Sequence, residues 1–336
     1  MITAGMGKVL EMLAPSSVHK LTPKPPKHTD GLAKEVYEQM REEFMIAGPF
    51  VLHGDIPELL AAAWCVVRET LLCGDASRGN KEIIAWAISE SNECPFCIGA
   101  HRAAVRETGA KEQSIEQWAR FSFSAEATAV KFTHQEHIAE FIGTLTAFHY
   151  LNRMVSVFLD EKMMPMPKVM DPVTDSMAKA MMVGVINKGG KKPAGESLKF
   201  LPNPDPAHAW KPEWAEDNQI ITKAIAAWSS TIETVALDHM RPKLLDFLRS
   251  ETQTWQGGRI NRSDIPDKNI PSYLSRSDRE AAKLALLIIM APHAVEDADV
   301  DVALNTGWSQ ENILALTAWS ALQAAKRCAT WTAARS

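Results

Sequence analysis

Two cysteines and a histidine stand at a spacing that suits thiol chemistry. Cys94 and Cys97 are three residues apart, and His101 follows the second cysteine by four residues. If a helix begins at the first cysteine, residues i, i+3 and i+7 share one face, so both thiols and the imidazole point the same way. Glu82, twelve residues before the first cysteine, would orient the imidazole. Two thiols, a base and a carboxylate are the minimum parts of a thiol-based redox site.

The chemistry that this group could perform is reduction of a peroxide or a disulfide. A thiol attacks either substrate as the thiolate, and a helix N-terminus stabilises that anion. His101 would accept the thiol proton or pass it to a leaving oxygen. After attack on a peroxide, Cys97 would become a sulfenic acid, which Cys94 would resolve as a disulfide. The spacing to the histidine favours Cys97 as the attacking thiol, whereas the position nearest the helix end favours Cys94.

Other interpretations of the cysteine pair stay open. A single C-x-x-C pair with one histidine could hold structural zinc or pack inertly, although zinc usually draws on four ligands and the chain has no second such pair. The chain would then be a non-redox scaffold or metal-binding protein. The same pair without peroxide specificity would make a general thiol–disulfide oxidoreductase or a redox sensor. The redox interpretation is favoured, and it predicts a site with no cofactor and no metal ion.

Composition narrows the class of protein. The chain has 336 residues, 46% of them apolar, which is enough for a sizeable core in one large domain or two. A net charge of −5 gives no electrostatic reason to expect a nucleic acid or an anionic membrane as partner. The longest apolar run, 284–291, is too short to span a bilayer, and the first residues do not resemble a signal peptide. Five cysteines, an odd number, suit a reducing compartment and predict a cytoplasmic protein.

Helical periodicity runs through nearly every long segment, and alternating strand patterns are scarce, so we predict an all-α fold. Residues 1–30 are rich in Pro and Lys and are predicted to form an extended arm. The helix that carries the motif should tolerate Pro95 in its first turn and end at Gly109. Helices are predicted over 59–72, from an N-cap at Asn80, over 93–108, over 135–159, and from 220 to the end with a polar interruption at 256–274.

An internal repeat relates the two halves of the chain. Lys81-Glu82 is similar to Arg279-Glu280, which lies 198 residues later (280 − 82). Farther along, Asn152-Arg153 is similar to Lys326-Arg327, now 174 residues later (327 − 153). At the first offset, the positions of Cys94, Cys97 and His101 hold Pro292, Val295 and Asp299. The second copy thus keeps the scaffold and lacks the chemistry.

We therefore predict four parts. Residues 1–45 form the N-terminal arm and first helix, and 46–162 form the repeat with the redox site. Residues 163–220 form an irregular connector with one helix near 176–185, because prolines and glycines interrupt any regular pattern. Residues 221–336 form the degenerate repeat.

The motif resembles a known family signature. Glu82, Cys94-Pro95-Phe96-Cys97 and Ala100-His101 are similar to the E-x11-C-x-x-C-x-x-x-H pattern of redox members of the carboxymuconolactone decarboxylase/alkyl hydroperoxidase D (AhpD-like) superfamily. The resemblance covers the first repeat well and the second weakly. It implies an all-helical AhpD-like fold, a homo-oligomer with helices packed across subunits, and thiol peroxidase activity. It also implies that the C-terminal cysteine, here Cys97, attacks the peroxide. The mycobacterial-type hydroperoxidase has a second histidine where this chain has Phe96.

The predicted function is reduction of hydrogen peroxide or an organic hydroperoxide by the Cys94/Cys97 pair, with His101 and Glu82 as a proton relay. The expected partners are a small-molecule peroxide and a dithiol reductant or redox protein. A lactone decarboxylase is a weaker alternative, because that chemistry does not need the cysteine pair.

Neighbouring side chains are interpreted as structural. His149 is expected to be a hydrogen-bonded core histidine. Arg153 and Arg327 recur in the two repeats and are each expected to pair with a buried acid. The aromatic residues around the motif are expected in the core, although an apolar lining would suit an organic hydroperoxide; they are Trp64, Trp86 and Phe96.

Overall fold

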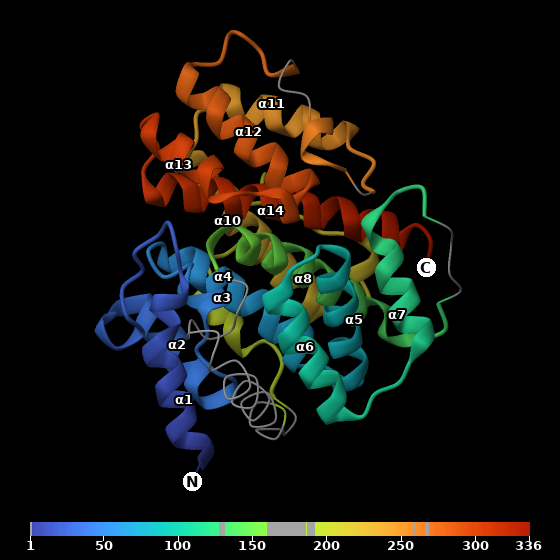
Figure 1. Ribbon diagram of the computed structural model, residues 1–336. Helices are drawn as coiled ribbons and strands as arrows, with labels where there is room; N and C mark the ends of the chain where they lie inside the picture. Colours follow the sequence, from blue (N-terminus) through green and yellow to red (C-terminus); the bar gives the residue numbers. More distant parts are fainter. Residues whose placement is uncertain (1, 128–131, 160–185, 187–191, 259, 266–268) are drawn as a thin grey trace, which may run out of the picture.

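The structure is a computed structural model that describes residues 2–127, 132–159, 186, 192–258, 260–265 and 269–336 (Figure 1). Within these ranges the regular elements are all helical, and the extended pairings are isolated bridges between single residues. The predicted all-α fold is confirmed. None of the described helices combines the length and hydropathy needed to cross a bilayer.

The described α-helices follow one another along the chain, most of them joined by short connections. The α-helices are α1 (Ile2–Leu13), α2 (Gly31–Glu43), α3 (Gly48–Val51), α4 (Pro57–Val67), α5 (Arg78–Ser91), α6 (Pro95–Thr108), α7 (Gln113–Arg120), α8 (Ile138–Phe158), α10 (Gln219–His239), α11 (Pro242–Thr254), α12 (Arg276–Met290), α13 (Asp297–Asn305) and α14 (Gln310–Ala333).

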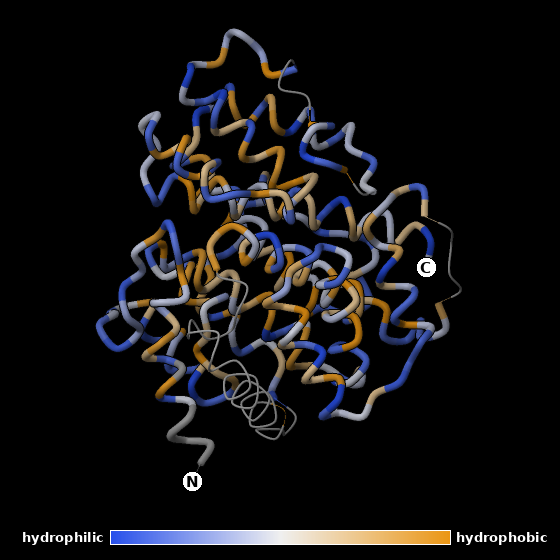
Figure 2. The backbone as a smooth tube through the Cα atoms, viewed as in Figure 1, coloured by the Kyte–Doolittle hydropathy of each residue, from blue (hydrophilic) through white to orange (hydrophobic). Residues whose placement is uncertain are grey.

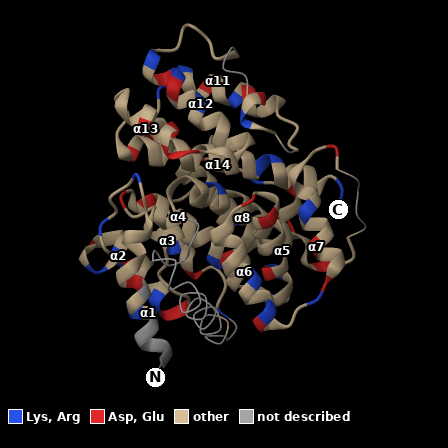
Figure 3. Cartoon of the chain, in the orientation of Figure 1, with Lys and Arg blue, Asp and Glu red and all other residues tan. Residues whose placement is uncertain are grey.

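Two long helices, α8 and α14, pack along each other at the centre of the molecule (Figure 1). Helices α5 and α6 pack together beside α8, and α12 and α13 pack together beside α14. One continuous apolar core joins the two groups, and Figure 2 shows the hydrophobic positions concentrated where the helices meet. Charged residues of both signs are scattered over the elements in Figure 3. Helix α8, which packs against α5 and α6, is therefore held from one side by the second half of the chain.

The N-terminal arm is not extended throughout, which corrects the prediction for residues 1–30. Residues 2–13 form α1, because the prolines that motivated the prediction begin only at Pro15. Glu11 of this helix makes a bidentate ion pair with Arg41 of α2, with Nε to Oε2 at 2.9 Å and Nη2 to Oε1 at 2.6 Å.

Three predicted helix boundaries shift. The N-cap of α5 is Ser77, three residues before the predicted cap, and its hydroxyl accepts the backbone N–H of Asn80 at 3.5 Å. The helix predicted over 59–72 changes into a π-helical turn, Arg68–Leu72, where two charged side chains turn into the core. The helix predicted over 135–159 opens with a short 3₁₀ turn, Gln135–His137, before α8. Helix α6 follows its prediction, ending at Gly109 with a φ of 66°.

The helix predicted near 176–185 lies outside the described residues. The described end of the connector is irregular apart from 3₁₀ turns at Glu196–Phe200 and Glu213–Ala215. The buried Glu69 carboxylate holds this stretch to the π-helical turn, because it accepts the Gly195 N–H at 2.7 Å and the Ser197 hydroxyl at 2.6 Å.

The two halves share local features at the predicted offsets. Ser77 caps α5 and Ser275 caps α12, and these caps are 198 residues apart (275 − 77). Arg153 of α8 donates to the Ile289 carbonyl oxygen, and Arg327 of α14 donates to the Trp255 carbonyl oxygen at 2.8 Å. The two arginines were expected to pair with buried acids. This expectation is corrected, since backbone carbonyl oxygens accept hydrogen bonds from both guanidinium groups.

Candidate functional site

The two cysteines lie at the junction of α5 and α6. Glu93 adopts a positive φ of 51°, which lets the chain turn sharply between the helices. Cys94 then caps α6, its N–H bonded to the Ser89 carbonyl oxygen at 3.0 Å, and Cys97 follows in the first turn. Both residues are free thiols with their Sγ atoms 2.7 Å apart. A disulfide between them therefore needs only a small approach of the two sulfur atoms.

His101 and Glu82 meet across α6 and α5. The Nδ1 atom of His101 lies 2.7 Å from Oε2 of Glu82, and the Nε–H group of Arg78 donates to Oε1 of the same carboxylate at 2.7 Å. Sequence analysis missed Arg78, although its place one helical turn before Glu82 was a usable signal. The structure thus brings together all four residues that the motif singles out, together with one additional cation.

The charge state of Glu82 sets the tautomer of the histidine. Burial would raise the pKa of the Glu82 carboxyl, but Arg78 and His101 outweigh burial and lower it to about 2. A carboxylate can only accept hydrogen bonds, so Nδ1 of His101 must carry a proton toward it. In the neutral imidazole, Nε2 is then the basic nitrogen, which is the form that a general base requires.

An apolar cavity of about 70 Å³ adjoins Cys97 and His101. The His101 ring packs edge-on against Phe148 with centroids 4.4 Å apart. Phe96 lines the cavity, as the apolar-lining interpretation expected, whereas Trp64 and Trp86 are not part of the wall. The wall consists of Phe44, Met45, Ala47, Pro49, Phe50, Val67, Leu71, Phe96, Cys97, Ala100, His101, Phe148, Leu151 and Val155.

Burial dominates the electrostatics of Cys97. Cys97 is only 5% exposed. Burial, together with the neighbouring Cys94, raises the pKa of the Cys97 thiol well above its ordinary value. The predicted stabilisation of the thiolate by the helix end is therefore outweighed in this resting state. Reaction at Cys97 consequently requires a base beside it, and His101 lines the same cavity.

A buried polar cluster lies behind the thiols, on the side of α8. His149 is fully buried, with Nε2 2.8 Å from the Ser122 hydroxyl and Nδ1 3.3 Å from the Asn92 amide nitrogen. Burial, and then the charge of Arg153, lower the pKa of His149 well below its ordinary value, so it stays neutral. This is the hydrogen-bonded core histidine that the sequence predicted. Sequence analysis missed the amides beside it, Asn92 and Asn152.

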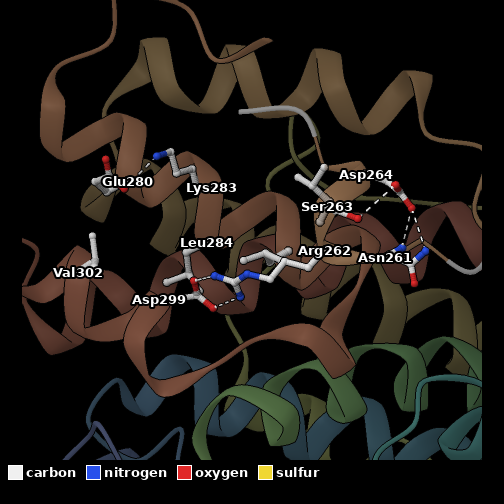
Figure 4. A pocket seen from close by; sticks show the side chains of 11 residues that line it. Asn261, Arg262, Ser263, Asp264, Glu280, Lys283, Leu284, Asp299 and Val302 are labelled. Carbon is white, nitrogen blue, oxygen red and sulfur yellow. Dashed lines mark hydrogen bonds and ion pairs between the residues drawn. The ribbon is translucent and has the colours of Figure 1, made fainter. Parts of the chain in front are cut away.

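A different pocket occupies the corresponding place in the second half (Figure 4). It is an open cleft of about 1230 Å³ between α12, α13 and the segment before α12. Asp299, at the position of His101, accepts a 2.7 Å hydrogen bond from Arg262, whose guanidinium reaches across the cleft. Glu280, at the position of Glu82, pairs with Lys283 at 3.4 Å. The cleft is lined by Asn261, Arg262, Ser263, Asp264, Ile265, Glu280, Lys283, Leu284, Leu287, Asp299 and Val302.

The remaining cysteines, Cys65, Cys73 and Cys328, are buried free thiols. Among the residues that the structure describes, no three His, Cys, Asp or Glu side chains gather as the ligands of a metal ion would.

Comparison with known proteins matches this site to a family. The model of the carboxymuconolactone decarboxylase family matches residues 58–149, a range that runs from α4 into α8 and contains the four motif residues. The chain is 28% identical over 335 residues to a Mycobacterium tuberculosis protein named alkyl hydroperoxide reductase, and the alignment covers 94% of each chain. No solved structure matches the chain. The resemblance predicted from the motif is confirmed, since residues 58–149 match the model of the carboxymuconolactone decarboxylase family.

Proposed function

We propose that this protein is a thiol peroxidase that reduces peroxides through Cys94 and Cys97, with His101 and Glu82 as its proton relay. The observation that carries the proposal is that the two thiols lie 2.7 Å apart, and that Cys97 and His101 line the same cavity. The name of the Mycobacterium tuberculosis relative supports the same class of reaction.

The first step is attack of Cys97 on the peroxide. Nε2 of His101 takes the thiol proton, the sulfur forms a bond to one peroxide oxygen, and the O–O bond breaks. The departing oxygen receives that proton and leaves as an alcohol or water, while Cys97 becomes a sulfenic acid. Cys97 is assigned as the attacking thiol because it lines the cavity wall and Cys94 does not.

The second step converts the sulfenic acid into a disulfide, and a reductant then restores the two thiols. The Cys94 sulfur attacks the Cys97 sulfenic acid, so a disulfide forms and water leaves. A dithiol reductant then returns both cysteines to thiols and is itself oxidised to a disulfide. Cys94 is only 1% exposed, so a small dithiol or a slender redox partner fits the approach better than a large protein face.

An organic hydroperoxide with a small apolar group suits the cavity. Its wall is apolar except at Cys97 and His101, so an alkyl group gains from leaving water while the peroxide oxygens face these two residues. Hydrogen peroxide would reach the same sulfur without that gain.

The division of the chain into two repeats is part of the proposal. Residues 46–162 would form the active repeat, and residues 221–336 a degenerate copy whose task is to support α8 through α14. The matching N-caps, Ser77 and Ser275, support this assignment. The segments 1–45 and 163–220 would be the N-terminal part and the connector.

A single-turnover experiment tests the function. Fully reduced protein is mixed with one equivalent of tert-butyl hydroperoxide or hydrogen peroxide, and the alcohol, the remaining peroxide and the disulfides are measured. One alcohol per chain and a Cys94–Cys97 disulfide are expected, with the tert-butyl compound reacting faster. The variant Cys328→Ser, which removes a buried thiol of the second half, is the matched control and should behave like the unmodified chain.

Absence of peroxide loss, together with rapid exchange with a disulfide substrate, would favour the thiol–disulfide oxidoreductase instead. A disulfide from Cys94 to Cys65, Cys73 or Cys328 would contradict the local pair.

A further inference from the structure

We propose that Arg78 is a positioning residue of the relay, which holds the Glu82 carboxylate against His101 and keeps the imidazole in its neutral, basic form. The inference rests on the proposed function and deepens it, by assigning a role to a residue outside the motif.

Arg78 and His101 divide the two oxygens of the Glu82 carboxylate between them. The Nε–H group of Arg78 donates to Oε1 at 2.7 Å, and its Nη2 atom lies 2.6 Å from the same oxygen. Nδ1 of His101 lies 2.7 Å from the other oxygen, Oε2. The carboxylate is fully buried, so these two residues fix its plane and its direction.

The start of α5 places the guanidinium. Arg78 is the first residue of α5, and Glu82 lies one turn later on the same face. Gly79 lets this end of α5 approach the end of α6 closely, because a Cβ atom there would lie 3.2 Å from Oγ1 of Thr108 and 2.7 Å from the Cβ atom of Ala110. The start of α5 is therefore fixed against the helix that carries the motif histidine.

The other charged groups of the neighbouring helices pair elsewhere. From α8, the His101 ring meets the apolar Phe148, and burial lowers the pKa of His149, which stays neutral. Among the described residues, the carboxylate of the relay is therefore balanced by Arg78 when the imidazole is neutral. The pairs on α5, α6 and α7 are Lys81 with Glu140 at 2.5 Å, Arg102 with Glu90 at 2.9 Å, and Arg120 with Glu116 at 2.9 Å.

The charge of Arg78 decides how strongly this buried pair attracts a proton. Burial would raise the pKa of the Glu82 carboxyl, and the charge of Arg78 is the largest of the effects that lower it to about 2. Without that charge, the carboxylate would be balanced by a proton, either on His101 or on Glu82 itself. A protonated His101 cannot accept the thiol proton, and a protonated Glu82 would donate to Nδ1 and leave the ring hydrogen on Nε2. In both cases the basic nitrogen, Nε2, is lost.

The second half of the chain repeats the spacing without the contact. Arg276 and Glu280 stand at the positions of Arg78 and Glu82, 198 residues later (276 − 78). Arg276 is exposed, and in the part of the chain that the structure describes no ion pair joins it to Glu280, which pairs with Lys283. The same two residue types thus pair where the carboxylate is buried beside a histidine. Arg276 therefore provides a matched control.

The test follows the His101 ring by nuclear magnetic resonance as the pH is lowered from 9 to 4, with no peroxide present. In protein that contains ¹³C-labelled histidine, the Cδ2 chemical shift separates the protonated ring and the two neutral tautomers. The signal of His101 is the one that is missing from His101→Ala. The midpoint at which the Nδ1–H tautomer is lost is compared among the unmodified chain, Arg78→Gln, Arg78→Lys and the control Arg276→Gln.

Arg78→Gln should raise this midpoint by about one pH unit or more, since a nearby opposite charge changes a carboxyl's proton binding by about 1–3 units. Arg78→Lys keeps the charge and should lie near the unmodified chain, as should Arg276→Gln. A purely structural role predicts a lower free energy of unfolding with an unchanged midpoint.

An unchanged or lowered midpoint in folded Arg78→Gln would overturn the inference. If that variant does not fold, the same outcome in Arg78→Met, which keeps the length of the stem, decides. A midpoint in Arg78→Lys as high as that of Arg78→Gln would also overturn it, because the effect would not follow the charge.

The titration needs no peroxide, so the two proposals fail separately. A protein that reduces no peroxide but shows the shift would refute the peroxidase function and leave the action of Arg78 on His101 intact. Normal peroxide reduction with an unchanged midpoint would refute only the role of Arg78. Where both proposals hold, the acid limb of single-turnover peroxide reduction should move to higher pH together with the midpoint.

Discussion

The cysteine site and the cleft at the corresponding place in the second half differ in how deeply their charged side chains are buried. The small cavity beside Cys97, of about 70 Å³, is lined from α3, α4, α6 and α8, whereas a larger cleft of about 1230 Å³ lies between α12, α13 and the segment before α12. At the position of Glu82, which is fully buried, the second half has Glu280, whose side chain is 25% exposed. The two places therefore differ more in the burial of their charged side chains than in the helices that carry them.

Burial matters because it sets the strength of the interactions between charged groups. Two surface ions gain little from each other, since water screens them and their side chains lose freedom. A carboxylate without water, such as Glu82 between Arg78 and His101, must be paired, and it holds its partners firmly. The residues that we assign to proton transfer are therefore the more enclosed ones, whereas Arg262, which pairs with Asp299 in the second cleft, is 44% exposed.

The largest expected effect comes from removing the attacking thiol. Cys97→Ser should abolish peroxide consumption, because no other group in the cavity wall can be oxidised to a sulfenic acid in its place. Cys94→Ser should allow one attack and then leave a sulfenic acid on Cys97. Dimedone labelling with peptide mapping checks both results. A label on Cys94 in the Cys97→Ser protein would reverse the assignment of the two thiols.

Breaking the relay should cost less than removing the sulfur. His101→Ala and Glu82→Gln should each slow peroxide reduction by roughly 10²–10⁴-fold, the usual worth of general acid–base catalysis. The double variant should lose less than the two losses combined, because both residues act through one proton path. Single-turnover rates check this, with circular dichroism to establish the fold. Full activity in either single variant would mean that the relay runs elsewhere.

Acid stability offers a matched comparison of the two halves. The pKa of Glu82 is lowered from 4.5 to about 2, so its ionised form contributes stability above pH 4.5 that is lost as the pH falls toward 2. Glu82→Gln should therefore flatten the acid dependence of the free energy of unfolding in that window. Glu280→Gln should leave it nearly unchanged, because its ion pair lies at the surface. Urea unfolding between pH 2 and 6 measures both, and equal effects would contradict the contrast in burial.

The smallest effect should come from the second cleft. Asp299→Ala removes the partner of Arg262, which is 44% exposed, and the carboxylate that accepts the Glu296 N–H at the start of α13, so the free energy of unfolding should fall by about 1–2 kcal/mol. Peroxide reduction should keep its rate, since Asp299 replaces the histidine where no thiol is present. Thermal melts and single-turnover rates check the two statements. A large loss of activity would show that the second half takes part in the chemistry.

The sequence alone determined the helical class and the placement of the motif. Helical periodicity is a local property, and the Cys94, Cys97 and His101 spacing places these side chains on one helix face wherever that helix lies. The start of α6 near Pro95 and its end at Gly109 follow from backbone preferences of those two residues. Boundaries that depend on competing caps, such as Ser77 against Asn80, and the N-terminal helix before Pro15 were missed.

Only the tertiary structure decided how the site is charged and enclosed. Glu82 pairs with Arg78 as well as with His101. At Cys97, the effect of burial on the thiol pKa outweighs stabilisation of the thiolate by the helix N-terminus. Both results depend on which side chains exclude water from the site. Asn92, beside the cysteine turn, donates to Asn152 of α8, 60 residues farther along, and no local pattern joins the two. Desolvation depends on many neighbours that are distant in the sequence, so the spacing of residues along the chain cannot predict it.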